Sequence, residues 1–157
     1  MAVTSTPIFP QTPNAGVMNA LLTTAMTNTK AFDGTDTAGT ALVNAYNSGT
    51  NGSRVDQCKI RYTSTNGAAA SGTTAATVIR LFQNNGSVNT TATNNKFIGE
   101  IAIPAQTVTA LATGTMPEYT YTLDLDIPAG HKIYAGSTVA VGGTNCALLI
   151  DITGGDY

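Results

Sequence analysis

The stretch EYTYTLDLDIPAG, residues 118–130, has the clearest pattern in this chain of 157 residues. From Tyr119 to Ile127, large apolar or aromatic residues alternate with threonine and aspartate. A period of two is typical of a β-strand with one buried and one solvated face. Pro128 cannot donate to a sheet and Gly130 accommodates a tight turn, so the strand ends there. The stretch predicts a strand whose tyrosines and leucines face a core.

A second stretch, SRVDQCKIRYTS at residues 53–64, predicts another half-buried strand. Cys58, Ile60 and the tyrosine that follows alternate with basic residues. Val55 is out of phase with them. An extra residue in one strand shifts the phase of the side chains, so we expect a bulge at residues 56–57.

Two adjacent stretches, residues 74–87 and 96–104, predict an antiparallel hairpin. The first has large apolar residues on both faces, which is typical of a central strand. One register places Arg80 opposite Glu100, the only carboxylate of the second strand. The same register places Phe82 opposite Ile98 and Val78 opposite Ala102. We expect Arg80 and Glu100 to form a structural ion pair that fixes this register.

The remaining pattern extends the same architecture over residues 17–157, which we expect to form a single domain. Short strands are predicted at 40–46, 131–136, 137–143 and 145–152, with turn signals every 8–15 residues and no long helix. Residues 16–28 have helical spacing at Val17, Leu21 and Ala25, but the surrounding threonines favour a strand there. No internal repeat of fixed period is present. The fold class predicted is all-β, an antiparallel β-sandwich that is jelly-roll-like.

The N-terminal residues 1–16, MAVTSTPIFPQTPNAG, cannot form a helix and are predicted to be an extended arm. Ile8 and Phe9 stand between Pro7 and Pro10. Two large apolar side chains in an extended arm need an apolar surface to lie against. That surface belongs either to a neighbouring subunit or to the edge of the chain's own sandwich, and both alternatives stay open.

Composition excludes several classes of partner. Charged residues make up 10% of the chain, against a usual share of about 25%. The net charge is −2 and no basic cluster is present, which argues against nucleic acid as the main partner. No apolar run is long enough for a membrane span, and the N-terminus lacks a signal-peptide pattern. The low charge fits either a β protein with solvated loops or a subunit of a large assembly.

Few residues offer catalytic or metal-binding chemistry. The candidates are His131, the cysteines Cys58 and Cys146, the pair Asp124 and Asp126, and the pair Asp33 and Asp36. No nucleophile motif, zinc spacing, full calcium loop or phosphate loop surrounds them. We therefore expect no enzyme activity, no cofactor and no metal, with the cysteines as buried hydrophobes. The chain also lacks tryptophan, the residue on which sugars often stack.

Five stretches carry a resemblance to a known class of protein: MAVTSTPIFPQTP, GSRVDQCKIRY, TVIRLFQNNGS, DIPAGHKIYAG and the final GGDY. They resemble small virion proteins of tailed phages and prophages. That class includes capsid decoration (cement) proteins, which are β-rich and often trimeric, and which tie major capsid subunits together on the outside of the head. It also includes head-fibre, tail and neck proteins.

The resemblance implies a non-enzymatic capsid decoration protein, a homotrimer that binds the major capsid protein or other virion subunits. It would be made in the host cytoplasm and lie on the capsid surface, with Pro7, Ile8, Phe9 and Pro10 as the partner-binding arm. The alternative is a receptor- or glycan-binding module of a phage tail or head fibre. A small hydrolase that uses His131 ranks behind both.

Overall fold

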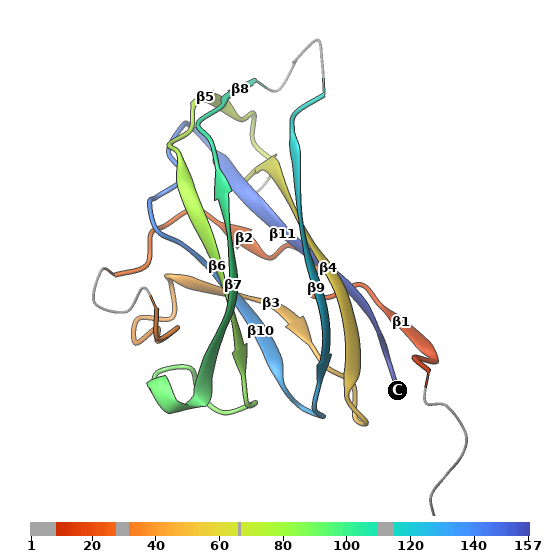
Figure 1. Cartoon of the computed structure of the whole chain (residues 1–157). Helices are drawn as coiled ribbons and strands as arrows, with labels where there is room; N and C mark the ends of the chain where they lie inside the picture. Colours follow the sequence, from red (N-terminus) through yellow and green to blue (C-terminus); the bar gives the residue numbers. More distant parts are fainter. Residues whose placement is uncertain (1–8, 28–31, 66, 110–114) are drawn as a thin grey trace, which may run out of the picture.

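The structure is a computed structural model that describes residues 9–27, 32–65, 67–109 and 115–157 (Figure 1). The described residues form an all-β protein with antiparallel sheets, as the sequence predicted. Their one helical segment is a short 3-10 turn, η2, at Ala92–Asn94. No described helix is long and apolar enough to span a membrane.

The strands form two main sheets and one small one. The first sheet has the order β1 (Thr12–Asn14), β11 (Cys146–Asp156), β4 (Ser53–Ser64) and β9 (Glu118–Ile127), with β2 (Leu21–Leu22) also paired to β11. The second has the order β3 (Leu42–Asn47), β10 (Lys132–Ser137), β6 (Thr77–Asn84) and β7 (Asn95–Ile103). The small sheet pairs β5 (Ser71–Thr73) with β8 (Thr107–Thr109) at one end of the molecule (Figure 1).

The strand pairs are nested along the chain. The innermost pair is β6 with β7, and outside it β4 pairs with β9. Next β3 pairs with β10, and outermost β2 pairs with β11. The chain therefore runs as one long antiparallel ribbon folded across itself, so that segments far apart in sequence lie side by side.

One hydrophobic core joins the two main sheets. Ile60 and Ile150 from the first sheet and Ile79, Leu81 and Ile133 from the second are fully buried in the same cluster. Ile60, Ile133 and Ile150 each have more exposed neighbours on both sides, as a strand with one wet face requires. The alternating residues of β9 pack against this core as half-buried side chains, which confirms the prediction for residues 118–127.

The outer face of the second sheet carries a smaller core. Met26, Leu42 and the fully buried Phe82 form a separate cluster. Residues 24–26 bond to Ser137 at the end of β10 rather than extend β2, and the predicted strand at 16–28 is limited to Leu21–Leu22. Gly136 shows how closely they approach, since a Cβ on it would lie 2.4 Å from the Met26 sulfur.

One strand register and one predicted strand differ from the sequence prediction, and a predicted bulge is confirmed. Phe82 lies opposite Phe97 rather than Ile98, because the register of β6 and β7 shifts between Leu81 and Phe82. Residues 138–143 form a loop and not a strand, with both glycines at a φ of 73° that a sheet does not accommodate. The bulge expected at residues 56–57 is confirmed by the register shift of β4 against β11, where β4 carries one extra residue between Val55 and Gln57.

Candidate binding surface

His131 lies just before β10, where its Nδ1 is 3.0 Å from the side-chain amide nitrogen of Gln83 on β6. The ring is half-buried, and this contact ties the turn before β10 to the end of β6. Within residues 9–27, 32–65, 67–109 and 115–157, no group of three or more His, Cys, Asp or Glu side chains is placed to hold a metal ion.

Asp36 organises the loop before β3. Its Oδ1 accepts hydrogen bonds from the backbone amides of Ala38 and Gly39, and its Oδ2 accepts from those of Ala41 and Leu42. The carboxylate is buried, and its acceptor capacity is directed at the backbone. Asp36 therefore shapes the loop and is not offered to a cation at the surface.

The two cysteines are free and buried. Burial, assisted by the negative charge of Asp151, raises the pKa of the Cys58 thiol to about 12. A thiol with such a pKa stays protonated at neutral pH and is a poor nucleophile. This agrees with the expectation that Cys58 is a buried hydrophobe.

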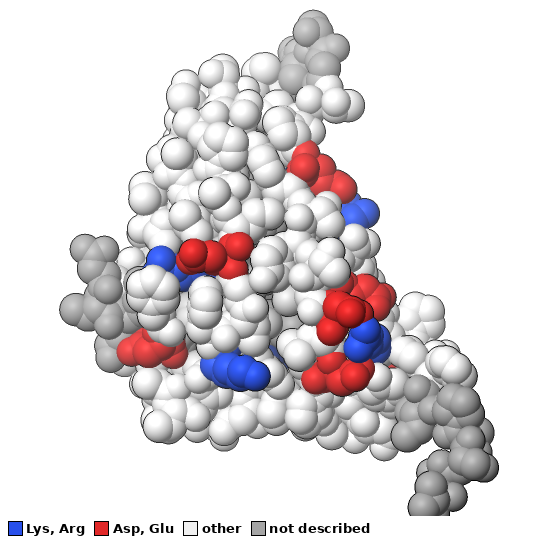
Figure 2. Space-filling model, viewed as in Figure 1, with Lys and Arg blue, Asp and Glu red and all other residues white. Residues whose placement is uncertain are grey.

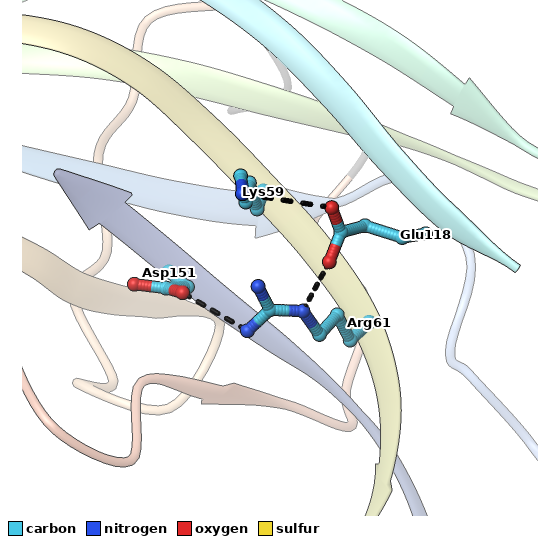
Figure 3. A network of polar contacts seen from close by, with 4 residues as sticks. All are labelled: Lys59, Arg61, Glu118 and Asp151. Atoms are coloured by element: carbon cyan, nitrogen blue, oxygen red, sulfur yellow. Dashed lines mark hydrogen bonds and ion pairs between the residues drawn. The ribbon is translucent and has the colours of Figure 1, made fainter. Parts of the chain in front are cut away.

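Charged side chains on the outer face of the first sheet pair with one another (Figure 3). Glu118 on β9 contacts Lys59 and Arg61 on β4, with 3.7 Å between Lys59 Nζ and Glu118 Oε1. Arg61 Nη1 also donates to Asp151 on β11, at 3.0 Å. The hydrogen bond from Arg61 lowers the pKa of Glu118 below its usual value. The network links three adjacent strands, β9, β4 and β11.

Asp124 and Asp126, the other carboxylate pair on β9, both contact Arg54 on β4. The Tyr157 hydroxyl donates to Asp126 at 2.5 Å. That hydrogen bond, more than the neighbouring Arg54, lowers the pKa of Asp126. The two carboxylates therefore link β9 to β4 through Arg54, and Asp126 also links β9 to the C-terminal residue Tyr157.

The described part of the N-terminal arm lies on its own chain. Thr12–Asn14 form β1 and pair with the end of β11, and the amide of Gln11 donates to the carbonyl of Asp156 at 2.8 Å. Pro10 packs against Gly155, where a Cβ would come within 2.6 Å of it. Pro7 and Ile8 lie outside the described residues.

The Asp156 side chain fastens this segment. Its Oδ1 accepts from Asn14 Nδ2 at 2.9 Å, from the amide of Gly49 and from the Ser53 hydroxyl. Burial alone would raise the pKa of Asp156, but these hydrogen bonds outweigh it and lower the pKa. Residues 10–14 are thus held in place, while Phe9 just before them is exposed.

Arg80 lies opposite Glu100, and its Nε donates to Glu100 Oε2 at 3.0 Å. Its guanidinium also lies over the ring of Phe32, 3.7 Å from the ring centroid. The sequence located the ion pair, since each residue is the only charge of its sign in its strand. The contact with Phe32 was not predicted, because Phe32 belongs to a loop far away in sequence.

The largest feature that sequence reasoning missed is an uncharged surface. Residues 62–79, 101–117 and 133–150 contain no Asp, Glu, Lys, Arg or His. The register brings parts of all three together, because β4, β7 and β10 end and β6, β9 and β11 begin at the same end of the sheets. Figure 2 shows that end as the white upper part of the molecule, above the coloured charges.

We call this region the uncharged end: residues 62–65, 67–79, 101–109, 115–117 and 137–146. Backbone hydrogen bonds hold it together, including Ser71 to Thr144 in both directions and the amide of Thr74 to the carbonyl of Gln106. Its exposed side chains are small and uncharged, mainly Ala, Thr, Gly and Pro. Tyr62, Val108 and Met116 line a shallow groove there. The signal in the sequence is the three long runs without a charged residue, which recur along the chain between charged segments.

No family model matches this chain, and no curated protein or solved structure matches it either.

Proposed function

We propose that this protein is a non-enzymatic structural protein of a tailed-phage virion, a capsid decoration protein that stabilises the assembled head as a homotrimer. The observation that carries the proposal is the uncharged end. The cores of protein interfaces are depleted in charged residues, since a buried charge needs a partner. A whole end without charge suits burial against other subunits. The resemblance of five stretches of sequence to small virion proteins points to the same class.

The strand order supports the finer fold that we propose, a jelly-roll β-sandwich. Eight positions, counting β1 and β2 as one, alternate between two four-stranded sheets as nested antiparallel pairs. A ribbon of four nested pairs rolled into two sheets is the arrangement of a jelly roll, a fold common in viral capsid and lectin domains. Such a fold is compatible with the proposed role, although a fold alone does not define a function.

The mechanism is mass action. A protein that binds the assembled shell but not the separate subunits stabilises the shell by RT ln(1 + [L]/Kd), which is about 2.7 kcal/mol at one hundred times Kd. The work is done by burial of apolar and small polar surface, and it requires neither bond chemistry nor a cofactor. The uncharged end supplies this surface, and the arm residues Pro7, Ile8, Phe9 and Pro10 supply a second contact with neighbouring subunits.

Cosedimentation with empty heads of the phage that encodes the chain tests this function. We compare Thr73→Glu, on β5 in the uncharged end, with Thr120→Glu on the charged outer face of β9; both threonines are exposed. A buried carboxylate without a partner should weaken binding at least tenfold, about 1.4 kcal/mol, for Thr73→Glu alone. Equal binding by the two variants would show that the uncharged end does not face the head.

One observation favours the alternative, a receptor- or glycan-binding module. A shallow groove between residues 36–39 and 86–90 is lined by Tyr134 and Lys132. An aromatic ring beside polar groups at a loop-lined groove is a common arrangement for binding sugars. Retention of the wild-type protein on a glycan array, abolished by Tyr134→Ala, would favour this alternative. Absence of retention would remove its support.

A further inference from the structure

Three of the four phenylalanines in this chain lie on its surface. Phe82 is fully buried, whereas Phe9, Phe32 and Phe97 are 70%, 66% and 39% exposed. Phenylalanine is among the residues most often buried in folded proteins. Exposed rings of this size, in a chain with few charges, mark places where a further surface is covered in an assembly.

Two of these rings form what we call the phenylalanine patch, Phe32 and Phe97. Their centroids are 6.0 Å apart in an edge-to-face arrangement, and Phe97 packs against Phe82 at 5.9 Å. The guanidinium of Arg80 supports Phe32 from one side. Because these contacts already fix the rings, a partner that docks on them loses little side-chain entropy.

The third ring, Phe9, begins the described part of the arm. Pro10 packs on Gly155 and Gln11 bonds to Asp156, so the backbone directly after Phe9 is held against the sheet edge. The Phe9 ring itself is 70% exposed among the residues that the structure describes. Proline on its C-terminal side restricts Phe9 to an extended backbone. The fold therefore presents Phe9 outward from a fixed point.

Arm and patch also match in charge. Residues 1–29 contain no charged side chain. The cation at the patch, Arg80, is already paired with Glu100 at 3.0 Å. An uncharged segment that covers this patch leaves no charge buried without a partner, whereas a charged partner would.

The arm and the patch lie on different parts of the molecule. β1 is at one edge of the first sheet, at the right of Figure 1, and Phe97 is on β7, the edge strand of the second sheet toward the left. A contact between them in two copies is therefore heterologous, with different surfaces on each side. Heterologous contacts form closed rings when their rotation closes, and a trimer is a small ring of this kind.

We propose that Phe9 of one copy docks on the phenylalanine patch of a second copy, and that three such contacts close the homotrimer. This inference rests on the homotrimer of the proposed function. It identifies Phe9 and the phenylalanine patch as the surfaces that join the subunits. The uncharged end then stays free to bind the head.

Light scattering on the full chain tests the contact. We compare wild type with Phe9→Ser, Phe97→Ser and the control Val88→Ser, which removes an equally exposed apolar side chain, 68% exposed. The expected result is a trimer for wild type and the control, and one third of that mass for both phenylalanine variants. A monomeric wild type, or a trimer in either phenylalanine variant, would overturn the proposal.

Disulfide trapping gives a readout that does not depend on loss of stability. Copies with Phe9→Cys are mixed with affinity-tagged copies with Phe97→Cys, while the native Cys58 and Cys146 are buried. Oxidation should cross-link one tagged to one untagged chain, and absence of this mixed product would overturn the proposal. Head binding is measured separately on the wild-type protein: a wild-type trimer that does not bind heads would contradict the proposed function and leave this contact standing.

Discussion

Replacement of Asp36 by alanine should lower the free energy of unfolding by about 2.5–4.5 kcal/mol. The Asp36 carboxylate accepts four backbone hydrogen bonds, three at 2.9 Å and one at 3.2 Å. The amide of Leu42 is buried, so its loss of a partner costs about 1–3 kcal/mol. The other three amides regain water, and each bond contributes about 0.5 kcal/mol net. The sum gives the predicted loss.

Asp36→Asn separates the two oxygens. Its carbonyl oxygen keeps the bonds to Ala38 and Gly39, but its amide group faces the donors of Ala41 and Leu42 and cannot accept from them. We therefore expect this variant to lose about 1.5–3.5 kcal/mol of stability.

The assay is urea unfolding, followed by circular dichroism at one fixed protein concentration, because the stability of an oligomer depends on concentration. Asp56→Ala, an exposed aspartate on β4, is the matched control and should change stability by less than about 0.5 kcal/mol. The reasoning is refuted if Asp36→Ala unfolds at the same urea concentration as this control, or if Asp36→Asn is as stable as wild type.

Three further predictions concern single side chains. Glu100→Gln should cost at most about 1 kcal/mol, because Glu100 is 48% exposed, and the cost should shrink in high salt; a loss above 2 kcal/mol would contradict a surface pair. The pKa of Asp156 is lowered from 3.8, so the stability that the ionised carboxylate contributes is present above about pH 3.8 and is lost as the pH falls through the folded-state pKa. Asp156→Asn should lack this loss of stability in acid unfolding, and identical acid transitions for the variant and wild type would contradict the prediction. Cys58, with a pKa near 12, should resist iodoacetamide at pH 8 until urea unfolds the chain, and modification of the native protein would refute its burial.

Local alternation predicted the strands that matter most to the fold. The side chains of residues 53–64 and 118–127 alternate because each strand has one wet face, and that pattern is written in adjacent residues. The Arg80–Glu100 pair was predictable for a similar reason, since Arg80 is the only cation of its strand and Glu100 is the only carboxylate of the neighbouring strand. The bulge at residues 56–57, seen in the pairing of β4 with β11, was predicted from a single residue out of phase.

Contacts between distant segments were beyond this reasoning. The pairing of β1 with β11 joins the two ends of the chain, and no local pattern specifies it. The shift that sets Phe82 against Phe97 arises from an extra residue in β7, which alternation alone does not reveal. Phenylalanine usually lies in the interior, so the residue types alone would have predicted that Phe32 and Phe97 are buried, whereas both are exposed.

The candidate surface was predictable only in part. Low charge suggested an assembly subunit from the sequence, and the charge-free runs were visible in it. That these runs meet at one end depends on the register of six strands, which only the structure supplies.

Calorimetry of empty phage heads, with and without this protein, tests the central claim most directly. The account predicts that saturating protein raises the temperature of head disassembly, with no change in the melting of unassembled major capsid protein. An unchanged disassembly temperature at saturating protein would contradict a role in stabilising the head.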